Sequence, residues 1–360
     1  MPRPIRASFN LSALRHNLGV VRRRAPKSGI WAVVKAGAYG HGLLRVAQTL
    51  SDADGYALLD LNDAVRLREA GSAKPVLLLE GIFRPADLQI VDQFGLAMVV
   101  HDFEQILMLE RAQLETQISV CLKINTGMNR LGFSGLQVRA AYGRLQASGK
   151  TAAISLMTHF ADADGVAGVT AQLARYSEWT AGLHGEETLA NSAAILRYPD
   201  THADWVRPGI MLYGCSPFAD VSAEALELQP VMTLASEIIA IQDIEAGERV
   251  GYGGIFVARQ AMRIGVVACG YADGYPRHAP GSNDSSTPVM VAGKRTNIVG
   301  RVSMDLLCVD LSAIPQARVG SPVILWGDGL PADEIAAKSG TISYELLCAL
   351  ATRVPQMEIE

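Results

Sequence analysis

The chain has 360 residues, of which 49% are hydrophobic and 19% are charged, and this ordinary globular composition excludes an intrinsically disordered protein. A chain of this length can bury a large core and predicts two domains, or one barrel with an addition. The formal net charge of −4 argues against a broad nucleic-acid-binding surface.

The first segments of the chain carry no targeting or membrane signal. Residues 1–8 lack the apolar core of a signal peptide. The helical pattern that follows ends in Arg22, Arg23 and Arg24, the only dense basic cluster. Cations suit the carboxyl end of a helix, so we interpret this cluster as a solvated cap. No apolar stretch approaches about 18 residues, so we expect a cytoplasmic protein without a membrane or nucleic-acid partner.

From about residue 10 to residue 215, strand-like and helix-like stretches alternate. Apolar runs that read as strands cover 31–35, 55–59, 75–80, 96–101, 118–125, 153–159, 188–192 and 206–213. Amphipathic stretches between them include 61–70, 103–112, 136–148 and 169–182. This alternation predicts βα units and a parallel sheet. Eight such units favour a closed (β/α)8 barrel of TIM type over an open doubly wound sheet.

After about residue 230 the helical periodicity nearly disappears. Apolar or alternating runs at 231–243, 262–269, 289–291, 306–311 and 322–326 are separated by Gly, Pro, Asn and Asp turns, with one helical piece at 332–339. We therefore predict an α/β chain in which residues 1–228 form the barrel domain. Residues 229–360 are predicted to form a smaller β-rich carboxyl-terminal domain.

Cysteine and histidine spacing gives no sign of a metal site. The five cysteines are scattered and contain no CxxC pair. They fit reduced thiols better than a disulfide framework or a zinc site. The seven histidines form no HExxH pattern, so we predict no metal.

The segment from Lys35 to Gly42 is the most informative in the chain. It closes a short apolar run that reads as a buried strand, which is a poor place for a solvated charge. A desolvated lysine loses its proton more readily, and a neutral ε-amine can form a Schiff base. The glycines beyond it allow the backbone to approach a large ligand closely. The alternative is a lysine that merely extends to solvent from an ordinary βα turn.

Several polar residues fall at the ends of successive predicted strands. They are Lys35, Lys123, Arg130, His159, Ser192 and Arg207. Taken singly, each has a structural explanation: a satisfied buried histidine, arginines in ion pairs, or a serine at a helix N-cap. In a barrel the carboxyl ends of all strands share one face, where active sites lie. Their common position therefore favours one shared pocket.

Motifs along nearly the whole chain give this chain a close resemblance to one enzyme family. The matching segments are VVKAGAYGHG (33–42), KINTGMNR (123–130), MTHF (157–160), NSA (191–193), VRPGI (206–210), VGYG (250–253), GYADG (270–274) and GRVSMD (300–305). In this order they resemble the alanine racemases, pyridoxal 5'-phosphate enzymes of fold type III. One departure is Gly37, where the family usually carries Asn or Asp, and this puts the stiffness of the loop in doubt.

The resemblance implies racemisation of L-alanine to D-alanine by two opposed acid–base groups, hence an isomerase (EC 5.1.1.1). The Cα proton is a very weak acid unless a cofactor delocalises the carbanion. By resemblance, Lys35 holds the cofactor and acts on one face, and Tyr252 of the partner subunit acts on the other. A phenol has a reference pKa of about 10, so it must be stabilised as phenolate. In the family, a chain from Tyr252 through His159 to Arg207 does this.

Other site residues are also implied by the resemblance. Arg207 faces the pyridine nitrogen of the cofactor, where a guanidinium cannot leave a proton, so the electron sink is weak. Arg130 bonds the phenolic oxygen of the cofactor and takes part in substrate binding. Lys123 matches a lysine that is carbamylated in some members, and an unmodified lysine paired elsewhere is the alternative.

The phosphate and the substrate entrance are assigned in the same way. The phosphate is held by Ser192, Tyr39, Tyr344 and the backbone N–H groups of Gly209 and Ile210. Met304 binds substrate, and Tyr271 and Asp305 line the entrance. Because Tyr252 and Met304 come from the opposing subunit, the resemblance implies a homodimer with shared active sites.

Two alternatives stay open from the sequence. One is a racemase of broader specificity or a decarboxylase on the same fold. Such decarboxylases place a carboxylate at the pyridine nitrogen, which Arg207 opposes. The other is a non-catalytic pyridoxal-phosphate-binding protein, but such proteins lack the β-rich domain. Both D-alanine biosynthesis and alanine breakdown remain open as roles.

Overall fold

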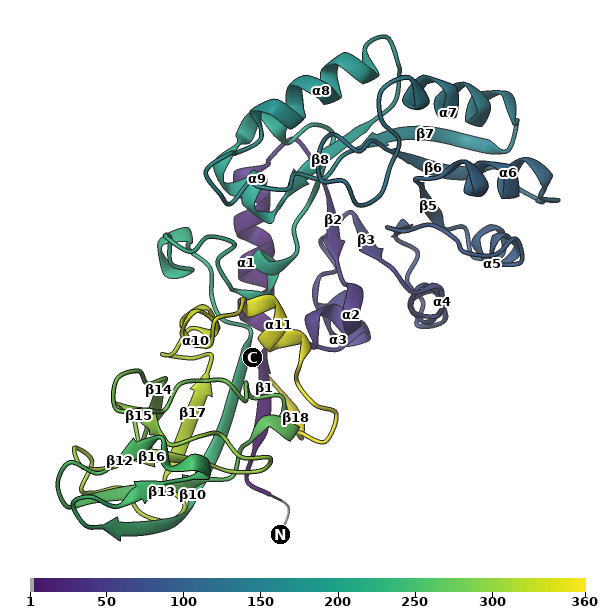
Figure 1. Cartoon of the computed structure of the whole chain (residues 1–360). Helices are drawn as coiled ribbons and strands as arrows, with labels where there is room; N and C mark the ends of the chain where they lie inside the picture. Colours follow the sequence, from purple (N-terminus) through teal and green to yellow (C-terminus); the bar gives the residue numbers. More distant parts are fainter. Residues whose placement is uncertain (1–2) are drawn as a thin grey trace.

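The computed structural model describes residues 3–360 and has two lobes, a barrel and a β-rich domain (Figure 1). Eight parallel strands close into the barrel. They are β2 (Gly29–Val33), β3 (Gly55–Leu58), β4 (Val76–Leu78), β5 (Ala97–Val100), β6 (Ile118–Lys123), β7 (Thr151–Met157), β8 (Glu187–Asn191) and β9 (Trp205–Arg207). The predicted closed barrel is confirmed. Strands β3 and β4 are buried along their whole length, as expected for parallel strands covered by helices.

Helices follow the strands and surround the barrel (Figure 1). They are α1 (Leu11–Arg24), α2 (Lys35–Tyr39), α3 (Leu43–Thr49), α4 (Leu61–Glu69), α5 (Asp87–Gln93), α6 (Phe103–Arg111), α7 (Leu136–Ala147), α8 (Thr170–Thr180) and α9 (Ser192–Arg197). Helix α1 begins where the Asn10 side chain accepts a hydrogen bond from Ala13 N. It ends with Arg22, Arg23 and Arg24 in its last turn, so the predicted basic helix end is confirmed.

The eighth predicted strand is much shorter than expected. Only β9 (Trp205–Arg207) pairs in the barrel, and Ile210–Tyr213 form a 3-10 turn. The prediction of a strand over 206–213 was wrong because Pro208 has no N–H for a sheet and Gly209 turns the backbone. The turn packs against the barrel through the Tyr213 hydroxyl, which donates to Val33 O at 2.9 Å.

The second lobe is built on an eight-stranded sheet, which confirms the predicted β-rich domain. Its strands in spatial order are β13 (Met262–Val267), β16 (Leu307–Asp310), β15 (Lys294–Val299), β14 (Pro288–Val291), β17 (Pro322–Trp326), β10 (Met232–Ile244), β1 (Arg6–Asn10) and β18 (Gln356–Ile359). A separate hairpin pairs β11 (Arg249–Val250) with β12 (Phe256–Val257). Two helices complete the lobe, α10 (Ala332–Lys338) and α11 (Ser343–Cys348).

Strand β1 joins this sheet although it comes before the barrel in the chain. It pairs antiparallel with β10 and parallel with β18. The sequence did not predict this, because β1 is short and its partners are more than 200 residues away. The domain boundary between residues 228 and 229 stays a prediction. Strand β1 precedes this boundary in the sequence but belongs to the sheet of the second lobe.

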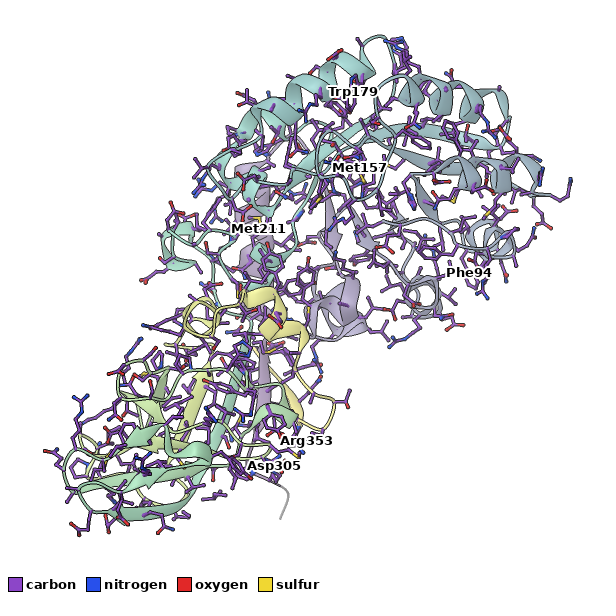
Figure 2. The ribbon with its side chains drawn as sticks, viewed as in Figure 1. Phe94, Met157, Trp179, Met211, Asp305 and Arg353 are labelled. Atoms are coloured by element: carbon purple, nitrogen blue, oxygen red, sulfur yellow. The ribbon has the colours of Figure 1, made fainter. Side chains whose placement is uncertain are left out.

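The core of the second lobe contains Trp326 and Tyr275. Their rings are stacked, with centroids 5.8 Å apart. Both side chains are at most 1% exposed. Near the edge of this lobe, Arg353 and Asp305 lie together (Figure 2).

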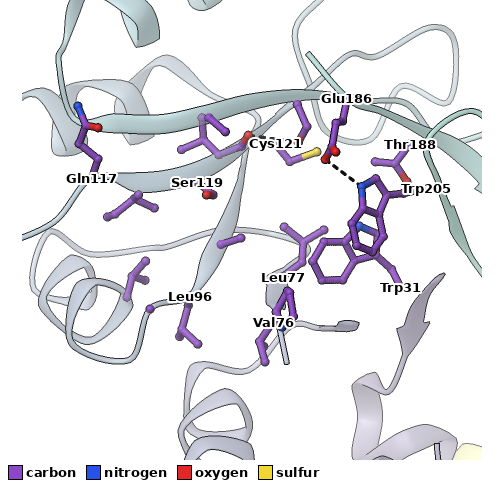
Figure 3. A pocket seen from close by; sticks show the side chains of 18 of the residues that line it. Trp31, Val76, Leu77, Leu96, Gln117, Ser119, Cys121, Glu186, Thr188 and Trp205 are labelled. Carbon is purple, nitrogen blue, oxygen red and sulfur yellow. Dashed lines mark hydrogen bonds between the residues drawn. The ribbon is translucent and has the colours of Figure 1, made fainter. Parts of the chain in front are cut away.

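The amino-terminal end of the barrel holds a cavity of about 430 Å³ (Figure 3). The rings of Trp31 and Trp205 stack at 4.6 Å on one side of it. Trp205 Nε1 donates to Glu186 Oε2 at 2.9 Å. The rings lie directly over Gly29 and Gly55, where a Cβ would collide with them. These glycines therefore allow two tryptophans to pack closely on the backbone where β2 pairs with β3 and β9.

Helix α11 reaches from the second lobe to the barrel. It contacts α2, and the Leu347 carbonyl sits where a Cβ on Gly40 would lie. This close approach brings Tyr344 to the carboxyl ends of the barrel strands. No helix within residues 3–360 has both the length and the apolar character needed to cross a membrane.

Candidate active site

A cavity of about 460 Å³ opens at the carboxyl ends of the barrel strands. It lies at the opposite end of the barrel from the tryptophan pair. Ten residues singled out in the sequence line it: Lys35, Tyr39, Lys123, Arg130, His159, Ser192, Arg207, Gly209, Ile210 and Tyr344. The structure therefore brings together polar residues from the whole length of the chain.

Lys35 opens a left-handed turn directly after β2. Residues Ala36, Gly37, Ala38 and Tyr39 all have φ between 53° and 59°. This conformation costs about 1–2 kcal/mol for each residue with a Cβ. Gly37 avoids that cost, and Asn and Asp are the other residues that enter this region readily. The turn therefore accounts for the glycine that departs from the family pattern.

The environment of Lys35 favours its neutral amine. Burial lowers the pKa of Lys35 below its ordinary value, and the Arg130 guanidinium lowers it further. Glu80 and Cys348 act in the opposite direction. Lys35 therefore lines the cavity as a partly desolvated amine and does not simply extend to solvent.

Lys123 is the last residue of β6, and Arg130 lies in the loop that follows. The loop is closed by hydrogen bonds between Phe133 N and Lys123 O (2.9 Å) and between Asn125 N and Phe133 O (2.8 Å). Burial lowers the pKa of Lys123 to about 8, and Arg207 and Arg130 contribute to this shift. A lowered pKa increases the fraction of neutral amine, which is the form that combines with carbon dioxide.

In cofactor-free protein kept in carbon-dioxide-free buffer, Lys123 is expected to react with acetic anhydride with a midpoint near pH 8. Only the neutral amine is nucleophilic, so the fraction modified follows deprotonation. Competitive labelling and peptide mass spectrometry measure the midpoint, with the exposed Lys294 as reference. A midpoint for Lys123 equal to or above that of Lys294 would contradict the shift.

Arg207 is buried and bonds to oxygens of neighbouring strands. Its Nη1 donates to Thr188 O (2.6 Å) and Thr188 Oγ1 (2.7 Å), and its Nη2 donates to Thr158 O (2.7 Å). These acceptors are all neutral, so they are not the ion-pair partner that the alternative explanation of Arg207 required. Burial lowers the pKa of Arg207 to about 10, which leaves the guanidinium protonated at neutral pH.

His159 lies next to this guanidinium. Arg207 Nη2 approaches His159 Nδ1 at 3.5 Å. Burial lowers the pKa of His159 well below its ordinary value, and Arg207, Lys123, Arg130 and Lys35 all contribute. The imidazole is therefore neutral at neutral pH.

Ser192 and Gly209 meet at the end of the cavity nearest β8 and β9. Gly209 N donates to Ser192 Oγ at 2.9 Å. Helix α9 is capped by the side chain of Asn191, which accepts from Ala194 N at 3.0 Å. Ser192 is therefore not the N-cap that the structural alternative proposed, and its hydroxyl belongs to the cavity.

Two tyrosines complete this end of the cavity. Tyr39 stacks on Tyr213 at 4.7 Å, and its ring lies 6.1 Å from that of Tyr344 on α11. Burial raises the pKa of both Tyr39 and Tyr344 above the ordinary phenol value, so both hydroxyls remain protonated donors. They come from different lobes and converge on one site.

Four further predicted residues lie on the second lobe and do not line this cavity. Three have exposed side chains: Tyr252 (67%), Met304 (54%) and Tyr271 (39%). Tyr252 follows β11 in a 3-10 turn, and Asp305 bonds to Arg353 Nη2 at 2.6 Å. In a single chain they stand apart from Lys35.

The segments that carry Tyr271 and Asp305 are fastened near one buried carboxylate. Asp273 is fully buried and accepts from Arg3 Nη1 (2.9 Å), Arg353 Nε (2.8 Å) and Gly270 N (2.9 Å). Arg3 Nη2 also donates to Asp305 O at 2.7 Å. Arg3 and Arg353 each bond to both Asp273 and Asp305, and so they hold together the segments that carry Tyr271 and Asp305.

Replacing Asp273 with Asn is expected to lower the free energy of unfolding by about 3 kcal/mol, because two arginines lose their buried counter-charge. Urea denaturation measures the change. The matched control is Asp305→Asn at an exposed ion pair, which should lower the free energy of unfolding by about 1 kcal/mol or less. Burial raises the pKa of Asp273, but hydrogen bonds from Arg3 and Arg353 outweigh this and lower it. The difference in the free energy of unfolding between wild type and Asp273→Asn should therefore be largest at neutral pH. It should vanish as the pH falls through that lowered pKa.

Sequence reasoning missed three ionisable residues of the cavity: Glu80, Asp164 and Cys348. Glu80 ended a predicted strand, so its position gave the same signal as that of Lys35. Asp164 lies in the long loop after β7. Cys348 is brought in by α11, which the sequence did not predict, and no local pattern could have found it.

Comparisons with known proteins agree with this geometry. The family model "Alanine racemase, N-terminal domain" matches residues 9–217, and "Alanine racemase, C-terminal domain" matches residues 231–358. The chain is 57% identical to an alanine racemase of Ralstonia pickettii (strain 12J), over 99% of this chain and 95% of that protein. It superposes on the biosynthetic alanine racemase from Pseudomonas aeruginosa with a TM-score of 0.96 and 44% identity, covering 99% and 100% of the two chains. For the enzyme from Acinetobacter baumannii, the TM-score is 0.93 and the identity is 37%, covering 99% and 100%.

Proposed function

The chain belongs to the alanine racemase family of isomerases (EC 5.1.1.1), and on this premise we propose that it interconverts L- and D-alanine with pyridoxal 5'-phosphate and two opposed acid–base groups. The observation that carries the proposal is the convergence of Lys35, Arg207 and the phosphate-type donors on one cavity.

The cavity has the chemistry that pyridoxal 5'-phosphate requires. A Cβ on Gly209 would come within 2.6 Å of Tyr39 Oη, so only a glycine lets the Tyr39 hydroxyl approach the backbone beside Ser192 this closely. Hydroxyl donors gathered in this way suit a phosphate. Three further groups that can carry positive charge line the same cavity: Lys123, Arg130 and Arg207. Their excess over the acids Glu80 and Asp164 suits an anionic ligand.

In this proposal Lys35 holds the cofactor covalently, and Ser192, Tyr39, Tyr344 and the backbone of Gly209 and Ile210 hold its phosphate. Ile210 begins a 3-10 turn, whose first N–H groups have no partner within the turn. The bound cofactor supplies an electron sink that stabilises negative charge at the substrate Cα. Once released by substrate, the neutral amine of Lys35 accepts or returns the Cα proton on its own face.

Arg207 sets the strength of that electron sink. It is protonated and has no acceptor lone pair, so it can donate to the pyridine nitrogen but cannot leave a proton there. A weak sink limits side reactions such as transamination, at the cost of a higher barrier to proton removal. Its neutral partners on Thr188 and Thr158 support this reading and oppose a decarboxylase, which would need a carboxylate at this position.

His159 links Arg207 to the opposite face. Because its Nδ1 faces the Arg207 guanidinium, the neutral ring carries its proton on Nε2. That N–H can donate to a phenolate, which is the form Tyr252 of the partner subunit needs to act as a base. Arg130 is proposed to bond the phenolic oxygen of the cofactor and to bind substrate.

A homodimer with shared sites is part of the proposal. Tyr252, Tyr271 and Met304 are exposed in the single chain and lie outside the cavity of that chain, so all three are free to contact a second copy. A second copy that covers them would bring Tyr252 and Met304 to the cavity and place Tyr271 and Asp305 at its entrance. We also propose a cytoplasmic location, a role in D-alanine biosynthesis, carbamylation of Lys123, and separate domains over residues 1–228 and 229–360.

The deciding experiment is a turnover assay with purified protein and added pyridoxal 5'-phosphate. L-Alanine should yield D-alanine, measured by a D-amino-acid oxidase couple, and D-alanine should yield L-alanine. Release of carbon dioxide would favour a decarboxylase, and equal rates with serine or larger amino acids would favour a broader racemase. Cofactor binding without any turnover would favour a carrier protein.

A further inference from the structure

His41 lies directly beneath the left-handed turn that follows Lys35. It is completely buried and lies outside the set of residues that line the cavity. Its Nδ1 is 2.8 Å from Tyr39 O and 3.2 Å from Ala38 O. Because carbonyl oxygens only accept hydrogen bonds, Nδ1 must carry the ring proton and donate it to the turn.

The rest of the ring is in an aromatic environment. Its centroid lies 4.7 Å from that of Tyr213 and 5.3 Å from that of Phe9 on β1. Within residues 3–360, the buried Nε2 has no hydrogen-bond partner. An unpaired buried nitrogen is unfavourable, and phenylalanine would fill this space without one. Packing alone therefore does not explain a histidine at this position, whereas the Nδ1–H bond to the turn does.

The imidazole is neutral at physiological pH. Burial lowers the pKa of His41 to about 4, although the hydrogen bonds to Tyr39 O and Ala38 O act in the opposite direction. Charged and titratable neighbours do not offset the burial: Arg45 lowers the pKa further, and its guanidinium lies over the Phe9 ring at 4.5 Å. The Nδ1–H donor is thus present at all working pH values.

We propose that His41 is a positioning residue whose Nδ1–H bond to the turn holds Tyr39 and Lys35 in the geometry that binds the cofactor. The turn contains three residues with a Cβ in the left-handed region, Ala36, Ala38 and Tyr39, which a free loop would leave readily. Donation to Tyr39 O fixes the residue whose hydroxyl lies against the Gly209 backbone in the cavity. This inference rests on the proposed cofactor and adds a residue that never touches it.

Two substitutions separate the hydrogen bond from the packing. His41→Phe keeps an aromatic ring between Phe9 and Tyr213 but has no donor. His41→Asn loses most of the ring, but its amide nitrogen replaces Nδ1 and can donate to the same carbonyls. The readout is the dissociation constant of pyridoxal 5'-phosphate for the cofactor-free protein, measured by fluorescence quenching, together with the melting temperature.

A donor role predicts opposite orders for the two measurements. His41→Phe should be more stable than His41→Asn. It should nevertheless bind the cofactor about tenfold more weakly than wild type, because a buried carbonyl of the turn loses its hydrogen bond. His41→Asn should melt lower and keep most of the affinity. If His41→Phe binds the cofactor as tightly as wild type, or if affinity simply follows stability in both variants, the proposal is wrong.

A second pair of variants tests the turn without changing any buried group. A Cβ at Gly37 or at Gly71 would meet no atom within 4 Å, and both glycines have positive φ (59° and 87°). Gly37 lies in the turn and Gly71 follows α4 outside the cavity lining, so Gly37→Val and Gly71→Val introduce a comparable backbone strain. Only Gly37→Val should weaken cofactor binding, again about tenfold. Equal affinities in the two variants would contradict a positioning role for the turn.

The same titrations keep the two proposals apart. If the wild-type protein does not bind pyridoxal 5'-phosphate, the proposed function fails. If the wild type binds and His41→Phe and Gly37→Val bind equally well, the proposed function stands and the role of His41 fails.

Discussion

Replacing Lys35 with alanine is expected to remove covalent attachment of pyridoxal 5'-phosphate and to lower kcat in both directions by at least about 10⁴-fold, the upper end of what one positioned acid–base group contributes. Both losses have one cause, because the same amine is proposed to hold the cofactor and to move the Cα proton on its face. Burial and the Arg130 guanidinium lower the pKa of this amine, which favours its reactive neutral form. No other lysine within reach of the turn can replace it, since Lys123 lies on β6 across the cavity.

Two measurements check this expectation. Borohydride reduction followed by peptide mass spectrometry should find the cofactor on the peptide that contains Lys35 in wild type, and on no peptide in Lys35→Ala. The exposed Lys338→Ala is the matched control and should behave as wild type. If the visible absorbance band of the cofactor survives dialysis of Lys35→Ala, Lys35 is not the residue that holds the cofactor.

Replacing Tyr252 with phenylalanine is expected to lower kcat by about 10²–10⁴-fold, the usual contribution of a positioned acid–base group. Cofactor binding should be almost unchanged, because Tyr252 does not line the cavity of its own chain. Solvent deuterium should still enter Cα of one enantiomer, because Lys35 still works on its own face. Equal loss of exchange for both enantiomers would count against two opposed groups.

Mixing the two inactive variants tests whether Tyr252 acts in the partner subunit. In a heterodimer of Lys35→Ala with Tyr252→Phe, one site would receive both substitutions and the other would receive neither. Random subunit exchange of equal amounts should therefore restore about a quarter of wild-type activity, given a two-fold symmetric dimer. If Tyr252 acted within its own chain, the mixture would stay as inactive as its components.

The barrel could be predicted because its signal is local. Apolar runs and amphipathic stretches alternate along the sequence, and each boundary depends on a few neighbouring residues. The convergence of Lys35, His159 and Arg207 followed from the rule that parallel strands share a carboxyl end. The roles of these residues came from the resemblance, not from spacing.

Other features depend on contacts that no local pattern contains. Strand β1 is defined by pairing with residues more than 200 positions away, and α11 reaches the cavity only because the second lobe folds beside the barrel. The left-handed turn is equally hidden, since Ala36, Ala38 and Tyr39 have no preference for positive φ. The short β9 shows the limit of hydrophobicity, because apolar residues after Pro208 are buried in a turn rather than in a strand.

The position of β1 between β10 and β18 has a consequence for how the protein is made. Strand β1 is synthesised long before its parallel partner, residues 356–359, and cannot pair with it until those residues have left the ribosome. Until then one side of β1 is an open edge that can pair with other nascent chains. Deleting the last five residues should therefore leave newly made protein prone to aggregation, although all cavity residues would still be present.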